Sequence, residues 1–148
     1  HHRLLALWAA DCAERVLPFF TEARPLDDRP ARAISMARAW AGGEATLLEA
    51  KSGAYHADAA ARDLAGAARY AAYAAGQAAV VAHVAAHDLG AAAYAIRAAM
   101  EAAPKAGRES VRLRERDWQR GRVPADLLDL VLEDERNRDD LCWKVFGD

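Results

Sequence analysis

Residues 67–103 decide the fold, and they run AARYAAYAAGQAAVVAHVAAHDLGAAAYAIRAAMEAA. Alanine is the strongest intrinsic helix former, and no proline interrupts this stretch. Residues that follow one another at spacings of four and three lie on one face of a helix. Here they are Tyr73, Gln77, Val80, Val84, His87, Ala91 and Tyr94. The opposite face carries Leu89, Ile96 and Met100. We therefore expect a long alanine-rich central helix, either sandwiched between other helices or broken near Gly90.

The whole composition agrees with a helical fold. The chain has 148 residues, of which 39 are alanine, and it is 53% hydrophobic and 28% charged with a net charge of −2. Arginine outnumbers lysine 17 to 3, a bias typical of GC-rich coding, which also raises alanine. These values exclude a disordered chain and a disulfide scaffold, and the length predicts a single domain, residues 1–148.

Other segments have helical periodicity or helix-end signals. These segments are 4–20, 29–40, 44–64, 110–119 and 124–138. Pro18 is expected to kink or end the first, and Asp27 or Asp28 to cap the second. Trp143, Val145 and Phe146 are expected to pin the terminus to the core. The sequence thus predicts an all-α bundle of about five to seven helices.

A membrane-spanning segment is not expected. Residues 70–87 hold no formal charge, but Gln77 and His83 interrupt them and alanine supplies most of the rest. The first residues enter an amphipathic helix directly, so we expect no signal peptide and a cytoplasmic protein. Cys12 and Cys142 are expected to be two buried thiols, which could pair only if the termini meet. We assign no role to His1 and His2.

The spacing His83-Val84-Ala85-Ala86-His87 is the one pattern suited to a metal. Residues four apart on a helix share a face, so both imidazoles could bind one zinc ion. The zinc-protease motif is absent because Val84 follows the first histidine where that motif has glutamate. The alternative, which we favour, is a pair of structural histidines bonded to neighbouring helices. We assign no metal.

The last 45 residues divide by charge. Residues 104–122 hold seven Lys/Arg and three Asp/Glu, whereas residues 123–148 hold three Lys/Arg and eight Asp/Glu. The stretch Arg108–Arg122, with Trp118 inside it, could bind nucleic acid. Interleaved acidic residues favour mutual pairing instead, which makes nucleic acid a weak alternative partner.

Local catalytic motifs are missing from the chain. No phosphate-binding glycine loop and no GxSxG nucleophile motif occurs. Asp27 and Asp28 could act as paired acids, but helix capping explains them more simply. We therefore predict a protein that is not an enzyme, without catalytic, cofactor-binding or metal-binding residues.

Several segments together form a pattern that covers nearly the whole chain. The opening part is Trp8-Ala9-Ala10-Asp11-Cys12-Ala13-Glu14-Arg15-Val16-Leu17-Pro18, Asp27-Asp28-Arg29-Pro30, Ala33-Ile34 and Ala37-Arg38-Ala39-Trp40. The central part is Gly76-Gln77-Ala78, Ala82-His83-Val84, His87 and Leu89-Gly90-Ala91-Ala92-Ala93-Tyr94-Ala95. The closing part is Glu115-Arg116, Trp118-Gln119, Pro124, Leu127, Leu130-Val131 and Cys142-Trp143.

With these segments the chain resembles a bacterial family of small helical proteins termed putative immunity proteins, named by analogy with the immunity partners of polymorphic toxins. It departs from the family pattern at Asp88, where a small apolar residue is expected. The resemblance implies an all-helical domain that neutralises a toxin by binding it. It brings no catalytic residues.

Three functions from different classes follow. The first is a cytoplasmic protein that covers a toxin's active cleft, with the acidic segment Asp126–Asp140 as candidate surface if the toxin is basic. The second is a ligand-binding or metal-binding bundle centred on His83 and His87. The third is a nucleic-acid-binding regulator, for which charge reversal at Arg112, Arg116 and Arg120 should abolish binding. An alanine-rich face would also permit a homodimer.

Overall fold

The chain is helical throughout, without strands. The computed structural model describes residues 1–148. It contains seven α-helices: α1 (His2–Ala23), α2 (Arg29–Ala41), α3 (Leu47–Ala61), α4 (Gly66–Val80), α5 (His87–Ala102), α6 (Arg108–Arg122) and α7 (Leu128–Arg138). Short 3₁₀ turns, Lys105–Gly107 and Ala125–Leu127, precede α6 and α7. The predicted all-α bundle is confirmed.

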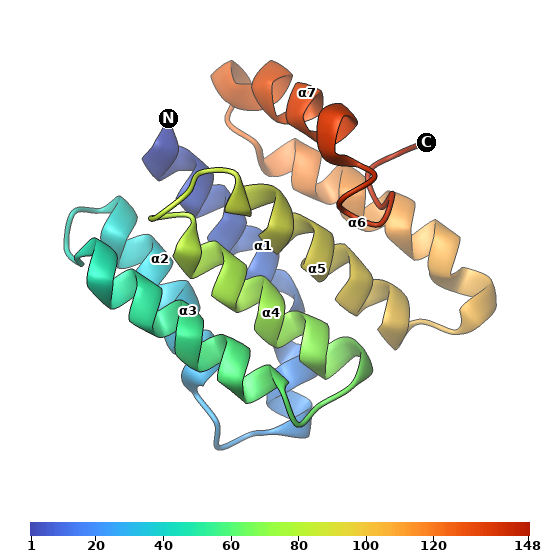
Figure 1. Ribbon diagram of the computed structural model, residues 1–148. Coiled ribbons are helices and arrows are strands. Elements are labelled where there is room, and N and C mark those ends of the chain that lie inside the picture. The colour runs from blue at the N-terminus through green and yellow to red at the C-terminus, as the bar shows by residue number, and fades with distance from the viewer.

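Helix α4 lies at the centre of a bundle formed by the first five helices. It packs against α1, α2, α3 and α5 (Figure 1). Because its neighbours surround it, its alanines are fully buried: Ala71, Ala72, Ala74, Ala75, Ala78 and Ala79. Small side chains let neighbouring helix backbones approach closely. The larger core side chains, Trp8, Phe20, Leu89 and Ile96, come from α1 and α5.

The close approach of α3 to α4 depends on Gly76. A Cβ atom at this position would lie 2.4 Å from Asp58 Oδ1 and 3.3 Å from the carbonyl oxygen of Ala54. Any larger residue would therefore push α3 away from α4.

Of the two alternatives for residues 67–103, the single sandwiched helix is wrong and the broken helix is correct. The chain turns at residues 81–86, so α4 and α5 are separate helices packed against each other. A single helix of that length would extend for about 55 Å. A chain of this size covers its alanines better by folding the segment back on itself. The break precedes Gly90, which lies inside α5.

Two helix boundaries differ from the sequence expectations. Helix α1 continues through the exposed Pro18 to Ala23, because buried Val16 and Phe20 hold both sides of it in the core. Helix α3 begins at Leu47 rather than residue 44. There the Thr46 hydroxyl accepts a hydrogen bond from Glu49 N, while the Glu49 carboxylate accepts one from Thr46 N, a capping box.

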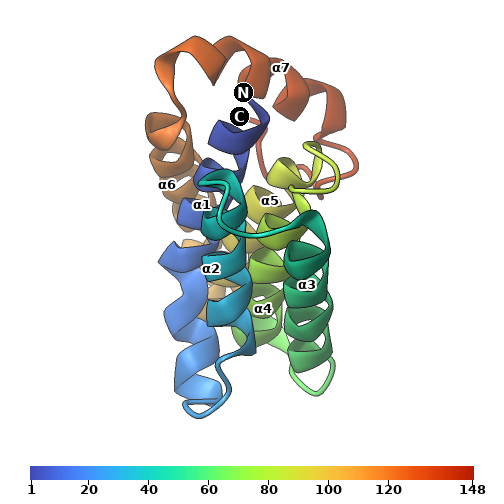
Figure 2. The same cartoon turned by 90° about the vertical axis from the view of Figure 1, so that its left-hand side faces the viewer.

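Helix α7 lies across the end of the bundle at which both termini are found (Figure 2). It is joined to α6 by the ion pair between Arg120 and Glu135, whose nitrogen and oxygen are 2.7 Å apart. Helix α6 is itself held to α1 and α5, since Trp8 donates a hydrogen bond to Gln119 O and Gln119 donates one to Ala92 O. No helix combines the length and apolar character that crossing a membrane requires.

Candidate partner-binding surface

The two histidines do not lie on one helix face. His83 is exposed in the turn before α5, and His87 is the first residue of α5, so the predicted helical i,i+4 pair is wrong. The His87 Nδ1 atom lies 2.8 Å from Gln77 Oε1. Burial, with a smaller contribution from His83, lowers the pKa of His87. No group of three or more His, Cys, Asp or Glu side chains is placed to hold a metal ion.

The arginines of α6 bind the end of the chain. Arg112 donates hydrogen bonds to the carbonyl oxygens of Val145, at 2.9 Å, and Gly147, at 2.6 Å. Arg116 donates to Gly147 O at 2.8 Å, and Arg120 donates to the carbonyl of Phe146 at 3.0 Å. These three guanidinium groups, which we call the arginine ladder, are occupied within the fold. The expectation that they contact nucleic acid has no support in this arrangement.

The remaining sequence candidates also have structural partners. Cys12 and Cys142 are free, buried thiols, as predicted. Asp27 accepts a hydrogen bond from Arg29 N at 3.1 Å and forms an ion pair with the Arg29 side chain. Asp28 makes no side-chain cap and pairs with Arg32 instead.

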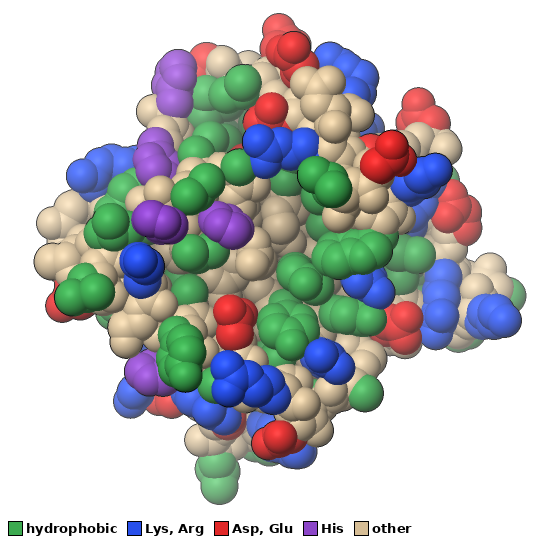
Figure 3. Space-filling view, viewed as in Figure 1, with side chains coloured by type: hydrophobic (Ala, Val, Ile, Leu, Met, Phe, Trp, Pro, Cys, Tyr) green, Lys and Arg blue, Asp and Glu red, His purple; other side chains and the backbone are tan.

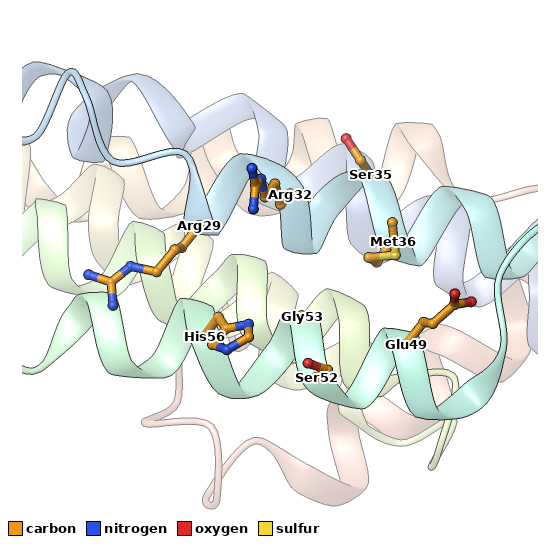
Figure 4. A pocket seen from close by; sticks show the side chains of 8 residues that line it. All are labelled: Arg29, Arg32, Ser35, Met36, Glu49, Ser52, Gly53 and His56. Atoms are coloured by element: carbon orange, nitrogen blue, oxygen red, sulfur yellow. The ribbon is translucent and has the colours of Figure 1, made fainter.

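A groove of about 450 Å³ lies between α2 and α3 (Figure 4). Arg29 and Arg32 line it, together with Glu49 on α3. Each of these charges is already paired, the arginines with Asp27 and Asp28 and the carboxylate with the N-terminus of its own helix. The groove therefore offers no unpaired arginine or carboxylate to a ligand.

Two buried carboxyl groups lie between α7 and the bundle. Asp88 is 2% exposed, and its Oδ1 accepts a hydrogen bond from Leu89 N at 2.6 Å. Burial raises the pKa of Asp88 to about 7. Burial likewise raises the pKa of Glu135, although its ion pair with Arg120 opposes the shift. Such perturbed groups also occur in active sites, but Asp88 does not line any of the five main hollows. Its pKa is also influenced by Asp134, Glu135 and Arg138 of α7.

Aromatic side chains gather on one face, in what we call the aromatic cluster: Tyr70, Tyr73, Tyr94, Trp143 and the guanidinium of Arg97. The ring centroids of Tyr94 lie 6.1 Å from Tyr70, 5.3 Å from Tyr73 and 4.9 Å from Trp143. Hydrophobic side chains, with Lys or Arg between them, fill the middle of this face over α4 and α5 (Figure 3). Tyr, Trp and Arg are the residues most enriched at the energetic centres of protein interfaces.

The position of Trp143 requires an unusual backbone. Trp143 and Lys144 have φ angles of 55° and 57°, in the left-handed region that costs a non-glycine residue about 1–2 kcal/mol. Asp139 fixes the turn, since its carbonyl accepts from Lys144 N at 2.8 Å and its carboxylate accepts from Phe146 N at 2.9 Å. The arginine ladder then holds the chain that follows.

This strained segment presents an aromatic ring to solvent. Trp143 is 47% exposed, whereas Val145 and Phe146 are buried as predicted. Trp143, which the sequence also predicts to pin the terminus to the core, packs at the surface on the half-buried Tyr94, because the left-handed turn directs it outward. Strain of this kind persists only where the surrounding contacts impose it, and it is concentrated at functional sites.

The predicted acidic surface forms a second feature, which we call the acidic ridge: Asp126, Asp129, Leu130 and Glu133. All four side chains are exposed on α7 and the turn before it. None of the three carboxylates makes an ion pair within the chain. Other acidic residues, such as Glu115 and Asp11, do make ion pairs. The segment from Asp139 to Lys144 connects this helix to the aromatic cluster.

The chain is thus a small all-helical protein whose surface carries the aromatic cluster and the acidic ridge. A model of the family described as Imm-5 like putative immunity protein matches residues 1–126, and the chain belongs to this family. The match ends before α7 and Trp143. No curated protein and no solved structure matches the chain.

Sequence inspection missed the aromatic cluster. The three-residue spacings from Tyr70 to Tyr73 and from Tyr94 to Arg97 place each pair on one helix face, and this signal was available. The approach of Trp143 was not, because it depends on the turn of residues 81–86 and on the path of the C-terminal segment.

Proposed function

We propose that this protein is an immunity protein that neutralises a bacterial toxin by binding it and covering its active cleft. Family membership supports the general function. The observation that supports a specific binding surface is the aromatic cluster. In this cluster a strained backbone holds the exposed Trp143 beside three tyrosines. Binding, rather than catalysis, is the proposed mechanism.

The aromatic cluster supplies what a binding centre needs. Tyr and Trp bring large contact areas with few rotatable bonds, so they lose little conformational entropy on binding. The contacts of Trp143 with Tyr94 and Arg97 already fix its ring in the free protein. Preorganisation of this kind increases affinity because the cost of ordering is met before the partner arrives.

The acidic ridge is assigned a different role in this proposal. Exposed, unpaired carboxylates attract a basic partner over a distance and increase the association rate more than the final affinity. We therefore expect charge reversal at Asp129 and Glu133 to slow association and to weaken its dependence on salt.

The proposal is tested by capture followed by growth rescue. The tagged chain is used as bait in a lysate of the source organism, and the captured protein is then produced in a bacterial host with and without the chain. We expect a stoichiometric partner that arrests growth alone and is tolerated when the chain is present. A Trp143→Ala variant should lose protection, whereas the matched variant Arg62→Gln, on the separate ring of Tyr55, should keep it. Absence of a partner, or a partner without toxicity, would contradict the function.

A further inference from the structure

Arg97 has the features of a receptor for a carboxylate group. Its guanidinium carbon lies 4.2 Å from the ring centroid of Tyr70 and 4.2 Å from that of Trp143. Contact with two rings fixes the orientation of the planar group. A guanidinium has five N–H donors, and one of them is used here, in a hydrogen bond of 2.8 Å to the Tyr70 hydroxyl.

The chain itself supplies no carboxylate to Arg97. Nine other arginines make ion pairs within 4.0 Å: Arg15, Arg29, Arg32, Arg38, Arg108, Arg112, Arg116, Arg120 and Arg122. Arg97 is absent from this set although it is half-buried. Arg69, at the edge of the cluster, likewise makes no ion pair; it lies over the ring of Tyr73 and donates a hydrogen bond to the Tyr73 hydroxyl.

Asp58, an acidic residue close to this cluster, makes no ion pair that would compensate for these charges. Asp58 is half-buried on α3, and its charge acts on the Tyr94 hydroxyl, but it forms no ion pair with either arginine. Lys144, beside Trp143, adds a further positive charge, which Asp140 meets only at 3.7 Å and in solvent. The cluster is therefore aromatic and cationic, in contrast to the acidic ridge on α7.

We propose that Arg97 binds a carboxylate side chain of the partner protein in a bidentate manner, with Tyr70 and Trp143 packing on either the same residue or its neighbours. This inference rests on the proposed function, since it names the chemistry of the surface that the immunity protein would cover. A planar guanidinium with free N–H groups matches the geometry of a carboxylate, and such paired, charge-assisted hydrogen bonds are among the strongest in proteins.

The two surfaces together describe the partner. The acidic ridge fits a basic surface, and Arg97 fits a carboxylate within or beside it.

A defined peptide tests the proposal without the toxin. The isotope-labelled full chain is titrated with the acetylated, amidated peptide Glu-Glu-Phe-Glu, while the NMR signals of the Arg97 side-chain N–H and the Trp143 indole N–H are followed. We expect both signals to shift in a saturable manner. The control peptide Gln-Gln-Phe-Gln should bind at least about tenfold more weakly, because it removes the charge from the hydrogen bonds.

Variants and a second anion separate the alternatives. Arg97→Gln should abolish the shift at Trp143, Arg97→Lys should weaken binding about tenfold because it loses the forked geometry, and Arg62→Gln should bind as the wild type does. Absence of a shift at Arg97, equal binding of the two peptides, or tighter binding of inorganic phosphate would overturn the proposal, the last result indicating a nucleotide or nucleic-acid partner. Failure of growth rescue with intact peptide binding would instead contradict the immunity function alone.

Discussion

Replacement of Asp88 by asparagine should make the free energy of unfolding markedly less sensitive to rising pH. The carboxyl group is buried at the start of α5, and burial raises its pKa from 3.8 to about 7. Below pH 3.8 the group is protonated in both the folded and the unfolded chain, so it affects stability little. Between about pH 4 and pH 7 the unfolded chain releases the proton and the folded chain retains it.

The size of the effect follows from this difference in pKa. Each pH unit in the interval lowers the free energy of unfolding by about 1.4 kcal/mol, so the whole shift corresponds to about 4 kcal/mol above pH 7. Asparagine has a similar shape and cannot ionise. Its extra N–H donors cost about 1–3 kcal/mol if they lack a partner, but this cost does not change with pH.

Urea unfolding at pH 4, 6 and 8 measures the effect. The stability of Asp88→Asn relative to the wild type should rise by about 4 kcal/mol between pH 4 and pH 8. The control Asp129→Asn, on the exposed side of α7, should change stability by less than about 0.5 kcal/mol at each pH. A difference for Asp88→Asn that stays constant across the range would show that burial does not keep this group protonated.

Three further predictions concern packing, the arginine ladder and backbone strain. Gly76→Ala should lower the free energy of unfolding by about 1–3 kcal/mol because the new Cβ would meet Asp58 and Ala54. Gly121→Ala has open space around it and should raise the free energy of unfolding by about 0.5–1 kcal/mol. Thermal unfolding of both variants tests these two expectations. Arg116→Ala should lower the free energy of unfolding by about 1–3 kcal/mol and accelerate hydrogen exchange of the Phe146 amide. Unchanged exchange would show that Arg116 does not anchor the C-terminal segment. Lys144→Gly should stabilise the fold by about 0.5–1 kcal/mol because glycine adopts the left-handed φ without strain, and a loss of stability in urea would contradict this.

The bundle could be predicted from the sequence because its signal is distributed over many residues. Alanine content and helical spacing are averaged along each segment, so single errors do not change the class. The sequence left a break near Gly90 as one of two alternatives, but the position of the break, at residues 81–86, could not be predicted in the same way. The break contains no glycine or proline, and it arises from the packing of α4 against α5, a tertiary effect that local propensity does not express.

The candidate surface was less predictable for a related reason. Charge alone predicts an acidic surface over Asp126–Asp140; the structure exposes Asp126, Asp129 and Glu133 of this segment, but it buries Glu135 against Arg120. In the sequence, the arginines of α6 looked equally available to bind a partner. In the structure they donate hydrogen bonds to main-chain carbonyls of a segment about 30 residues later in the chain. The same long-range contacts set the position of Trp143, so the aromatic cluster exists only once the chain has folded.

The arginine ladder has a consequence for how this protein can diversify. Its acceptors in the terminal segment are mainly main-chain carbonyl oxygens, which every residue supplies, so these hydrogen bonds do not depend on the exposed side chains at positions 141, 143 and 144. Substitutions at positions such as 141, 143 and 144 can therefore alter the face shown to a partner while the underlying attachment persists. In the proposed function, the segment is therefore attached through its main chain while its exposed side chains meet the partner, so a few point mutations would change the recognised target without altering the scaffold.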